Sequence, residues 1–416
     1  MEEALSFKFG PSDVMFSLLS LIFFLVDVVL DLWAIDCLYK EEKYFSMGLL
    51  ICLLVSSSVL LQIFSWLWYT DSSRILETNV ERFFSTHGLL PLVHICQFGL
   101  FLRFAATMEI STCGFKQRNV FPKGVTIYIK HDLSMLRVFE AFSESAPQIV
   151  LMTALIIEMK EMQSFTVIKI LGSLSALAFT VLSYHRNMRV FVSEKFKMGW
   201  TSSVIYFLWN LLLIGPRVAC VSLFASMLPC YLPAHFLSLW MLFFLWAWWQ
   251  NTDFMDTKSG EWLYRATVGI IWYFSWFNVT SGNIKSKGII YHVVMVMDMM
   301  MLLGLWWWRR SLEQASLSPL PINPYLLIAM LTFIYIIGIL LKLLYYWKLH
   351  PKKPVLQINR KDQEPHLKLK RDEECISILK TDLGETHKAE PECIVLSQTQ
   401  NTGIHKRIRI MVGNFY

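Results

Sequence analysis

Residues 44–69 read YFSMGLLICLLVSSSVLLQIFSWLWY, an apolar stretch without a charged side chain. A helix of about 20 apolar residues crosses the hydrocarbon core of a bilayer, which is about 30 Å thick. A second uncharged stretch runs from residue 218 to residue 250. The whole chain is 55% hydrophobic and only 17% charged, whereas a soluble domain has about 25% charged residues. The sequence therefore predicts an integral membrane protein.

Similar apolar segments recur along the chain. We predict about eight transmembrane helices, at residues 13–35, 44–69, 132–158, 163–184, 202–227, 234–250, 288–308 and 324–347. Two further apolar segments, 83–102 and 261–279, contain or adjoin Gly and Pro residues or turns. We expect these two to be re-entrant, or partly inserted, on one face of the membrane. The predicted fold class is an all-α, polytopic membrane protein.

Basic residues indicate the orientation. They gather at 103–137, at 186–197 and in the tail after residue 350, and the positive-inside rule assigns such segments to the cytoplasm. Both termini are then cytoplasmic, with residues 1–350 forming the transmembrane domain. Residues 351–416 are predicted to be a largely disordered, regulatory cytoplasmic tail. A ten-span count is the alternative, and it would move the basic segment 103–137 to the outside.

Ionisable residues inside apolar helices indicate a structural or functional role, because inserting each one at the centre of a bilayer costs about 2.5 to 3.5 kcal/mol. The first predicted span contains Asp13, Asp27 and Asp31. At about 100° and 1.5 Å per residue, these carboxylates form one stripe about 27 Å long. In the third span, Glu140 and Glu144 lie one turn apart on one face. Arg137 lies one turn before Glu140, and possible counter-charges from other segments are Arg103, Arg217, Asp298 and Lys342.

Two interpretations of these charges remain open. They form either a salt-bridge network that only holds helices together, or a polar path across the membrane. The sequence contains no zinc-protease HExxH motif, no serine nucleophile elbow and no P-loop. We therefore predict no enzymatic activity, no metal and no cofactor. Basic loops that flank apolar helices also argue against nucleic-acid binding.

Several motifs, taken in order, resemble those of the XK-related membrane proteins. The first is DLSMLRVFE at 132–140 followed by SAPQ at 145–148. The others are SVIYFLWNLLL at 203–213 with Pro216 and Arg217, TDFM at 252–255, EWLYR at 261–265 and YFSWFNV at 273–279. The resemblance extends from about residue 13 to residue 351 and does not include the tail.

This resemblance implies a phospholipid scramblase of the plasma membrane. Scrambling of this kind is bidirectional and ATP-independent, and it exposes phosphatidylserine when a caspase cuts the cytoplasmic tail in apoptosis. The resemblance also implies eight spans with two partly inserted segments, and a single-span chaperone such as basigin or neuroplastin. The intramembrane residues that it carries over are Asp13, Asp27, Asp31, Arg103, Glu140, Glu144, Arg217 and Asp298.

The chain departs from the family pattern at two places. Ser183 stands where the resemblance predicts an acid, and the tail lacks an Asp-x-x-Asp-Gly caspase site. The best remaining caspase candidate is Asp382, at the end of LKTD in 379–382. Two other functions stay open: a non-transporting scaffold that docks a cytoplasmic lipid-transfer protein, and an ion channel or solute carrier, which would need the charges to line a pore.

Overall fold

The computed structural model describes residues 11–70, 78–115, 123–159, 164–191, 198–279, 284–312 and 323–349. All regular elements in these residues are helices, which confirms the all-α prediction. Seven of the described helical segments are long and apolar enough to cross a membrane. They correspond to α1 (Pro11–Lys40), α2 (Tyr44–Thr70), α8 (Ser164–Phe191), α9 (Trp200–Met227), α10 (Leu232–Trp249), α12 (Ile284–Leu312) and α13 (Pro324–Leu344).

The remaining predicted span, 132–158, is part of a longer and more polar helix. It consists of α6 (Lys123–Glu140), a single π-helical turn, η1 (Ala141–Ser145), and α7 (Ala146–Met159). Short η helices also follow α9 and α13, at Pro229–Tyr231 and Tyr345–Leu349.

The two segments predicted to be re-entrant are shorter helical pieces. The first region comprises α3 (Asn79–Thr86), α4 (Leu90–Ile95) and α5 (Gly99–Phe115), and the second is α11 (Lys258–Phe274). One correction follows for residues 103–137. We described them as a basic loop, but the described part of this range lies in α5 and α6, and both Arg103 and Arg137 are buried.

The α4–α5 turn is attached to α2 through one side chain. The Gln62 amide donates to the carbonyl of Gln97 and accepts from the backbone N–H of Gly99, at 3.2 and 3.1 Å. A Cβ atom at Gly99 would lie 2.4 Å from the Gln62 Oε1 atom. A larger residue at this position would therefore displace the side chains of Gln62 and His94, and with them the hydrogen bonds that attach the turn to α2.

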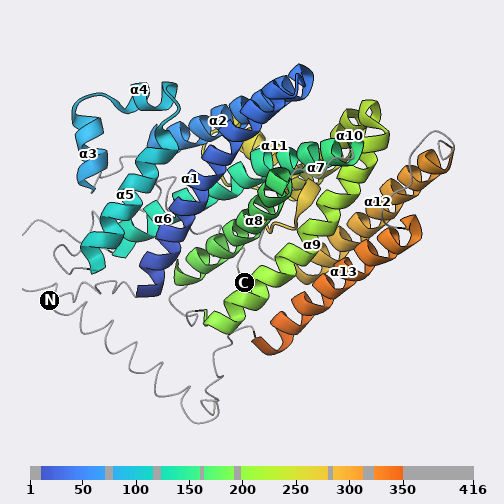
Figure 1. Cartoon of the computed structure of the whole chain (residues 1–416). Coiled ribbons are helices and arrows are strands. Elements are labelled where there is room, and N and C mark those ends of the chain that lie inside the picture. The colour runs from blue at the N-terminus through green and yellow to red at the C-terminus, as the bar shows by residue number, and fades with distance from the viewer. Residues whose placement is uncertain are drawn as a thin grey trace, which may run out of the picture.

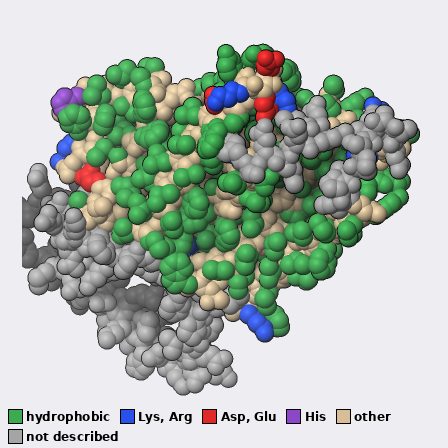
Figure 2. All heavy atoms as spheres, in the orientation of Figure 1, with side chains coloured by type: hydrophobic (Ala, Val, Ile, Leu, Met, Phe, Trp, Pro, Cys, Tyr) green, Lys and Arg blue, Asp and Glu red, His purple; other side chains and the backbone are tan. Residues whose placement is uncertain are grey.

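The centre of the bundle is formed by α8 and α9. About half of each apolar window is buried, 50% in α8 and 56% in α9, compared with 17% in α10 and in α13. Helix α9 packs against α7, α8, α12 and α13. Helices α3–α5 lie at one side of the bundle and α12 and α13 at the other (Figure 1). The face in Figure 2 is covered mainly by hydrophobic side chains, as expected of a surface that contacts lipid.

Candidate functional site: an intramembrane charge cluster

The π-helical turn η1 determines where the central acidic residues lie. Its widened geometry is marked by the Ala146 N–H, which donates to the carbonyl of Ala141 five residues earlier. Single π turns inside α-helices occur frequently at functional sites. Glu140 ends α6 and Glu144 lies within η1, and both are at least nine-tenths buried. This turn therefore presents two carboxylates to the interior of the bundle.

Helix α1 contributes two more buried carboxylates. The Asp27 side chain accepts hydrogen bonds from Ser145 on η1 and from Ser173 on α8, at 2.9 and 3.3 Å. Asp31 lies 2.9 Å from the ammonium of Lys169 on α8. Asp27 and Asp31 are 6% and 3% exposed. Asp27 and Asp31, two of the three residues in the stripe predicted on the first helix, are thus covered by other helices of the same chain.

The carboxylates of the two segments form one cluster. Glu144 lies close enough to Asp27, Asp31 and Glu140 for appreciable electrostatic repulsion. Glu140 forms a buried ion pair with Arg137, one turn earlier on α6. Hydroxyl groups also lie beside these carboxyl groups: Ser57 on α2 forms a hydrogen bond of 2.7 Å with Ser143 on η1. We call Asp27, Asp31, Glu140, Glu144, Arg137 and Lys169 the charge cluster.

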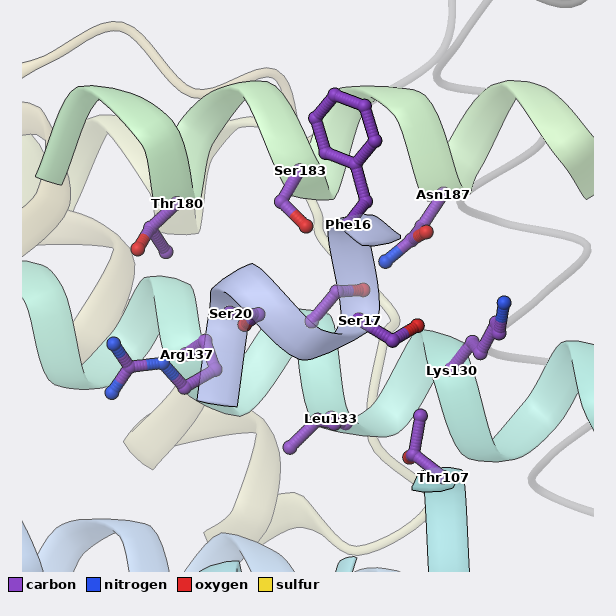
Figure 3. A pocket seen from close by; sticks show the side chains of 11 residues that line it. Phe16, Ser17, Ser20, Thr107, Lys130, Leu133, Arg137, Thr180, Ser183 and Asn187 are labelled. Atoms are coloured by element: carbon purple, nitrogen blue, oxygen red, sulfur yellow. The ribbon is translucent and has the colours of Figure 1, made fainter. Parts of the chain in front are cut away.

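A small polar hollow, with a cavity volume of about 20 Å³, adjoins the charge cluster. Side chains of α1, α5, α6 and α8 line it (Figure 3). Two of its lining residues are cations, Lys130 and Arg137, and no carboxylate is among the described residues that line it. Its polar uncharged lining consists of Ser17, Ser20, Thr107, Ser134, Thr180, Ser183 and Asn187. Arg137 belongs to both the hollow and the charge cluster, so the two sites adjoin at this side chain.

Ser183 faces this hollow from α8 (Figure 3). An acid at this position would lie in the same hollow as Arg137 and Lys130. The serine side chain keeps this position of the hollow polar and uncharged. The acid that the resemblance predicts here is therefore absent from the lining.

Arg103 does not join the charge cluster. Its guanidinium pairs with Asp132 on α6 at 3.0 Å and donates to the side chain and the carbonyl of Ser65 on α2. The same guanidinium lies over the ring of Tyr69, 4.2 Å from its centroid. The expectation that Arg103 would act as a counter-charge to the stripe was wrong, because this nearer acid holds it among α2, α5 and α6.

Arg217 and Asp298 form a second, separate pair between α9 and α12. Asp298 also lies 2.9 Å from His235 on α10, and Arg217 donates to the carbonyl of Tyr273 at 3.0 Å. We had named both residues among the possible counter-charges from other segments. They instead pair with each other.

The structure does not describe the side chains of two candidate residues named from the sequence, Asp13 and Asp382. Asp13 is within α1, but the placement of its side chain is outside the described part of the structure, as is the whole of the tail with Asp382. Sequence analysis in turn missed Lys169 and Asp132 as partners. Lys169 had a visible signal, because it is a charged residue within the apolar 163–184 segment.

The fold and the buried charges together define an all-helical polytopic membrane protein with ionisable residues inside its bundle. Sequence comparison gives the family. The profile of the XK-related proteins matches residues 15–351, and the chain belongs to this family, as the motifs indicated.

Curated relatives agree with this assignment. XK-related protein 8 of Tetraodon nigroviridis is 41% identical over 359 residues, covering 84% of this chain and 86% of the relative. The protein of the same name from Gasterosteus aculeatus is 41% identical over 366 residues, covering 85% and 87%. That of Pan troglodytes is 35% identical over 342 residues, covering 82% and 84%.

Proposed function

We propose that this protein is a phospholipid scramblase, which moves phosphatidylserine and other phospholipids between the two leaflets of the plasma membrane without ATP. One observation carries the proposal. An acid-rich charge cluster and a cation-lined hydroxyl hollow lie side by side inside an apolar bundle and share Arg137. Polar groups at membrane depth that are arranged in this way suit a polar substrate that crosses.

The charges match the two ends of a phospholipid headgroup. The charge cluster has four carboxyl groups, Asp27, Asp31, Glu140 and Glu144, and two cations, Arg137 and Lys169, and so contains two more acidic groups than basic ones. Such an excess favours an amine or choline group. The hollow, with its cations and hydroxyl groups, favours the phosphate. The acyl chains would remain in lipid, against the apolar exterior.

Family membership and the sequence resemblance support this proposal at the level of the class of protein. From the positions of the basic segments we propose cytoplasmic termini. From the resemblance we propose activation in apoptosis through the tail, with Asp382 as the caspase candidate, and a single-span chaperone such as basigin or neuroplastin. Cover for Asp27 and Asp31 on α1 does not require that chaperone, because α8 and η1 already bury these two carboxyl groups. Loss of surface delivery in cells that lack the chaperone would test the pairing, and normal delivery would contradict it.

The decisive experiment is a lipid-scrambling assay with purified protein in liposomes that contain a fluorescent phospholipid. A form lacking residues 351–416 is used beside the full chain, so that a closed resting state does not mask the activity. We expect the fluorescent lipid to move between the leaflets faster than in protein-free liposomes, and at a rate that does not depend on ATP. The double variant Asp27→Asn with Glu144→Gln keeps side-chain size, and we expect it to slow lipid movement by about tenfold, the loss of about one charge-assisted hydrogen bond.

The matched control is Asp36→Asn. Asp36 lies on the same helix and pairs with Lys40, but it is half exposed and outside the charge cluster. We expect this variant to scramble at the normal rate. Normal scrambling by the double variant would show that the charge cluster is only structural. Liposomes that show no lipid movement with either form of the protein would favour the scaffold, and ion flux without lipid movement would favour a channel.

A further inference from the structure

A second hollow lies among α9, α11, α12 and α13, and its cavity volume of about 10 Å³ gives room for about one water molecule. Its wall is largely aromatic, and its polar lining includes Trp209, Arg217, His292 and Tyr335. A polar cavity of this size holds an ordered water when about two to four polar groups can bond it. None of the residues of the charge cluster lines the hollow, so it is a site apart from the proposed lipid path.

Two buried donors in the wall of this hollow lack an acceptor. The Trp209 Nε1 and the Arg217 Nη2 have no hydrogen-bond partner among the described residues, and the two residues are only 6% and 1% exposed. An indole N–H and a guanidinium can only donate. Buried donors are nearly always paired, either with protein or with ordered water. The ligand of the hollow is therefore a hydrogen-bond acceptor, which excludes a metal cation, and the small volume excludes a polyatomic anion such as phosphate.

A chain of hydrogen bonds reaches the hollow from α13. The ammonium of Lys342 lies 2.8 Å from Nε2 of His292, and Nδ1 of His292 lies 3.0 Å from the hydroxyl of Tyr335. Because an ammonium only donates, Nε2 accepts from Lys342, and the Nδ1–H then donates to the Tyr335 oxygen. This oxygen retains a second lone pair. Tyr335 also lies close enough to Arg217 for an appreciable electrostatic interaction, although the Arg217 Nη2 forms no direct hydrogen bond with it.

Helix α13 has no direct side-chain hydrogen bond to the helix on which it packs. It lies against α9, yet the hydrogen bonds that its described side chains make to other helices both end on His292 of α12. Lys342 reaches α9 only by lying over the ring of Trp209, 5.1 Å from its centroid. A molecule in the hollow is therefore placed to supply the missing polar link between α13 and α9.

We propose that one water molecule is bound in this hollow and ties α13 to α9. The water accepts from the Trp209 Nε1 and the Arg217 Nη2, and it donates to the hydroxyl oxygen of Tyr335. A buried water typically makes about three such bonds. The chain that starts at Lys342 is thereby joined to the Arg217–Asp298 ion pair in one polar network across α13, α9 and α12. This inference goes beyond the proposed function and does not depend on it.

The test detects the water directly, by X-ray footprinting of the full chain in maltoside detergent. Brief irradiation turns a bound water into a hydroxyl radical, which adds oxygen to the side chains beside it, and mass spectrometry locates that oxygen. We expect Trp209 to be oxidised despite its burial. The control is Trp272, which is also buried but donates its Nε1–H to the carbonyl of Phe277 at 2.6 Å and does not line the hollow. We expect no oxidation there.

Rapid mixing with heavy-oxygen water shortly before irradiation separates a bound water from bulk solvent. The exposed Trp249 should take up the heavy isotope at once, whereas Trp209 should still take up the light one.

The variant Tyr335→Phe removes one oxygen atom, and we expect it to abolish the oxidation of Trp209. It should also raise the equilibrium constant for unfolding by about threefold to tenfold, the loss of about one hydrogen bond. Because Tyr335 also bonds His292, the oxidation of Trp209 rather than the stability reports on the water. The matched control is Tyr325→Phe on the same helix, where the side chain is 66% exposed, and we expect neither quantity to change.

Three results would overturn the proposal. Oxidation of Trp209 as weak as that of Trp272 would show that the hollow is dry. Uptake of the heavy isotope at Trp209 as fast as at Trp249 would mean that bulk solvent, not a bound water, reaches it. Undiminished oxidation of Trp209 in the Tyr335→Phe variant would show that the water does not bond α13. If this variant does not fold, the first two comparisons, made on the unaltered protein, still decide.

Discussion

The ion pair between Lys169 and Asp31 connects α8 to α1 and offers the most direct test of how the charge cluster is balanced. The two charged groups lie 2.9 Å apart, and their side chains are 3% and 5% exposed. Lys169 also donates to the carbonyl of Leu30 at 3.2 Å. We consider Lys169→Met and Asp31→Asn, each close in size to the side chain it replaces.

The magnitude follows from this burial. At 2.9 Å, an effective dielectric constant of about 20 gives an attraction of about 6 kcal/mol. Removing one partner of a buried pair typically costs about 3 to 5 kcal/mol, because the other charge is left uncompensated. The two variants should nevertheless differ. Lys169→Met leaves four carboxylates with Arg137 as the cation of the charge cluster, whereas Asp31→Asn removes one of the repelling carboxylates.

We therefore expect Lys169→Met to cost the upper end of that range and Asp31→Asn the lower end. The double variant should cost less than the sum of the two by at least about 2 kcal/mol, as expected for residues in direct contact. The free energy of unfolding is measured by titrating dodecyl sulfate into the maltoside-solubilised protein. Additive costs, or a larger cost for Asp31→Asn than for Lys169→Met, would refute the view that the charge cluster holds excess negative charge.

Two further predictions concern the packing of α13 and the tail. Gly338→Ala should destabilise the protein by about 1 to 3 kcal/mol through overpacking, because its Cβ would lie 2.8 Å from a side-chain carbon of Leu213 and 3.1 Å from the backbone of α9. Gly304→Ala, where nothing lies within 4 Å, is the control in the same unfolding titration. Truncation near Pro354 should expose phosphatidylserine constitutively, while truncation after Asp382 should expose little, since a few kcal/mol of tail contact suffice to close the resting state. Annexin binding on live cells measures the phosphatidylserine exposed by each truncated form at matched surface levels. If the form truncated near Pro354 binds no annexin, the tail does not keep the protein closed.

The fold was largely predictable because transmembrane helices have a strong one-dimensional signal. Seven of the described helical segments follow apolar stretches seen in the sequence. The region 103–137 was harder. Hydropathy counts the charged residues Arg103, Asp132 and Arg137 as polar and so favours a loop. It does not reveal that Arg103 and Asp132 neutralise each other, or that all three side chains are buried.

The candidate site was only partly predictable. Helical periodicity places Asp27 with Asp31, and Glu140 with Glu144, because residues one turn apart share a face. It gives no information about which helices face each other. The two ion pairs join segments that are distant in the sequence. Asp31 and Lys169 are 138 residues apart, and Arg217 and Asp298 are 81 residues apart.

The pairing pattern also bears on the choice between a clamp and a path. Arg103 with Asp132, and Arg217 with Asp298, are balanced pairs, and each suffices to hold neighbouring helices together. The charge cluster is not balanced, because its carboxylates outnumber its cations. A purely structural network would gain nothing from two additional buried carboxylates, because each of them must either repel its neighbours or take up a proton. Such an excess becomes favourable when a positively charged group enters, and the cation-lined hollow next to it would accept the opposite charge of the same headgroup. The location of the imbalance, rather than the number of charges, is therefore what favours a path for lipid headgroups.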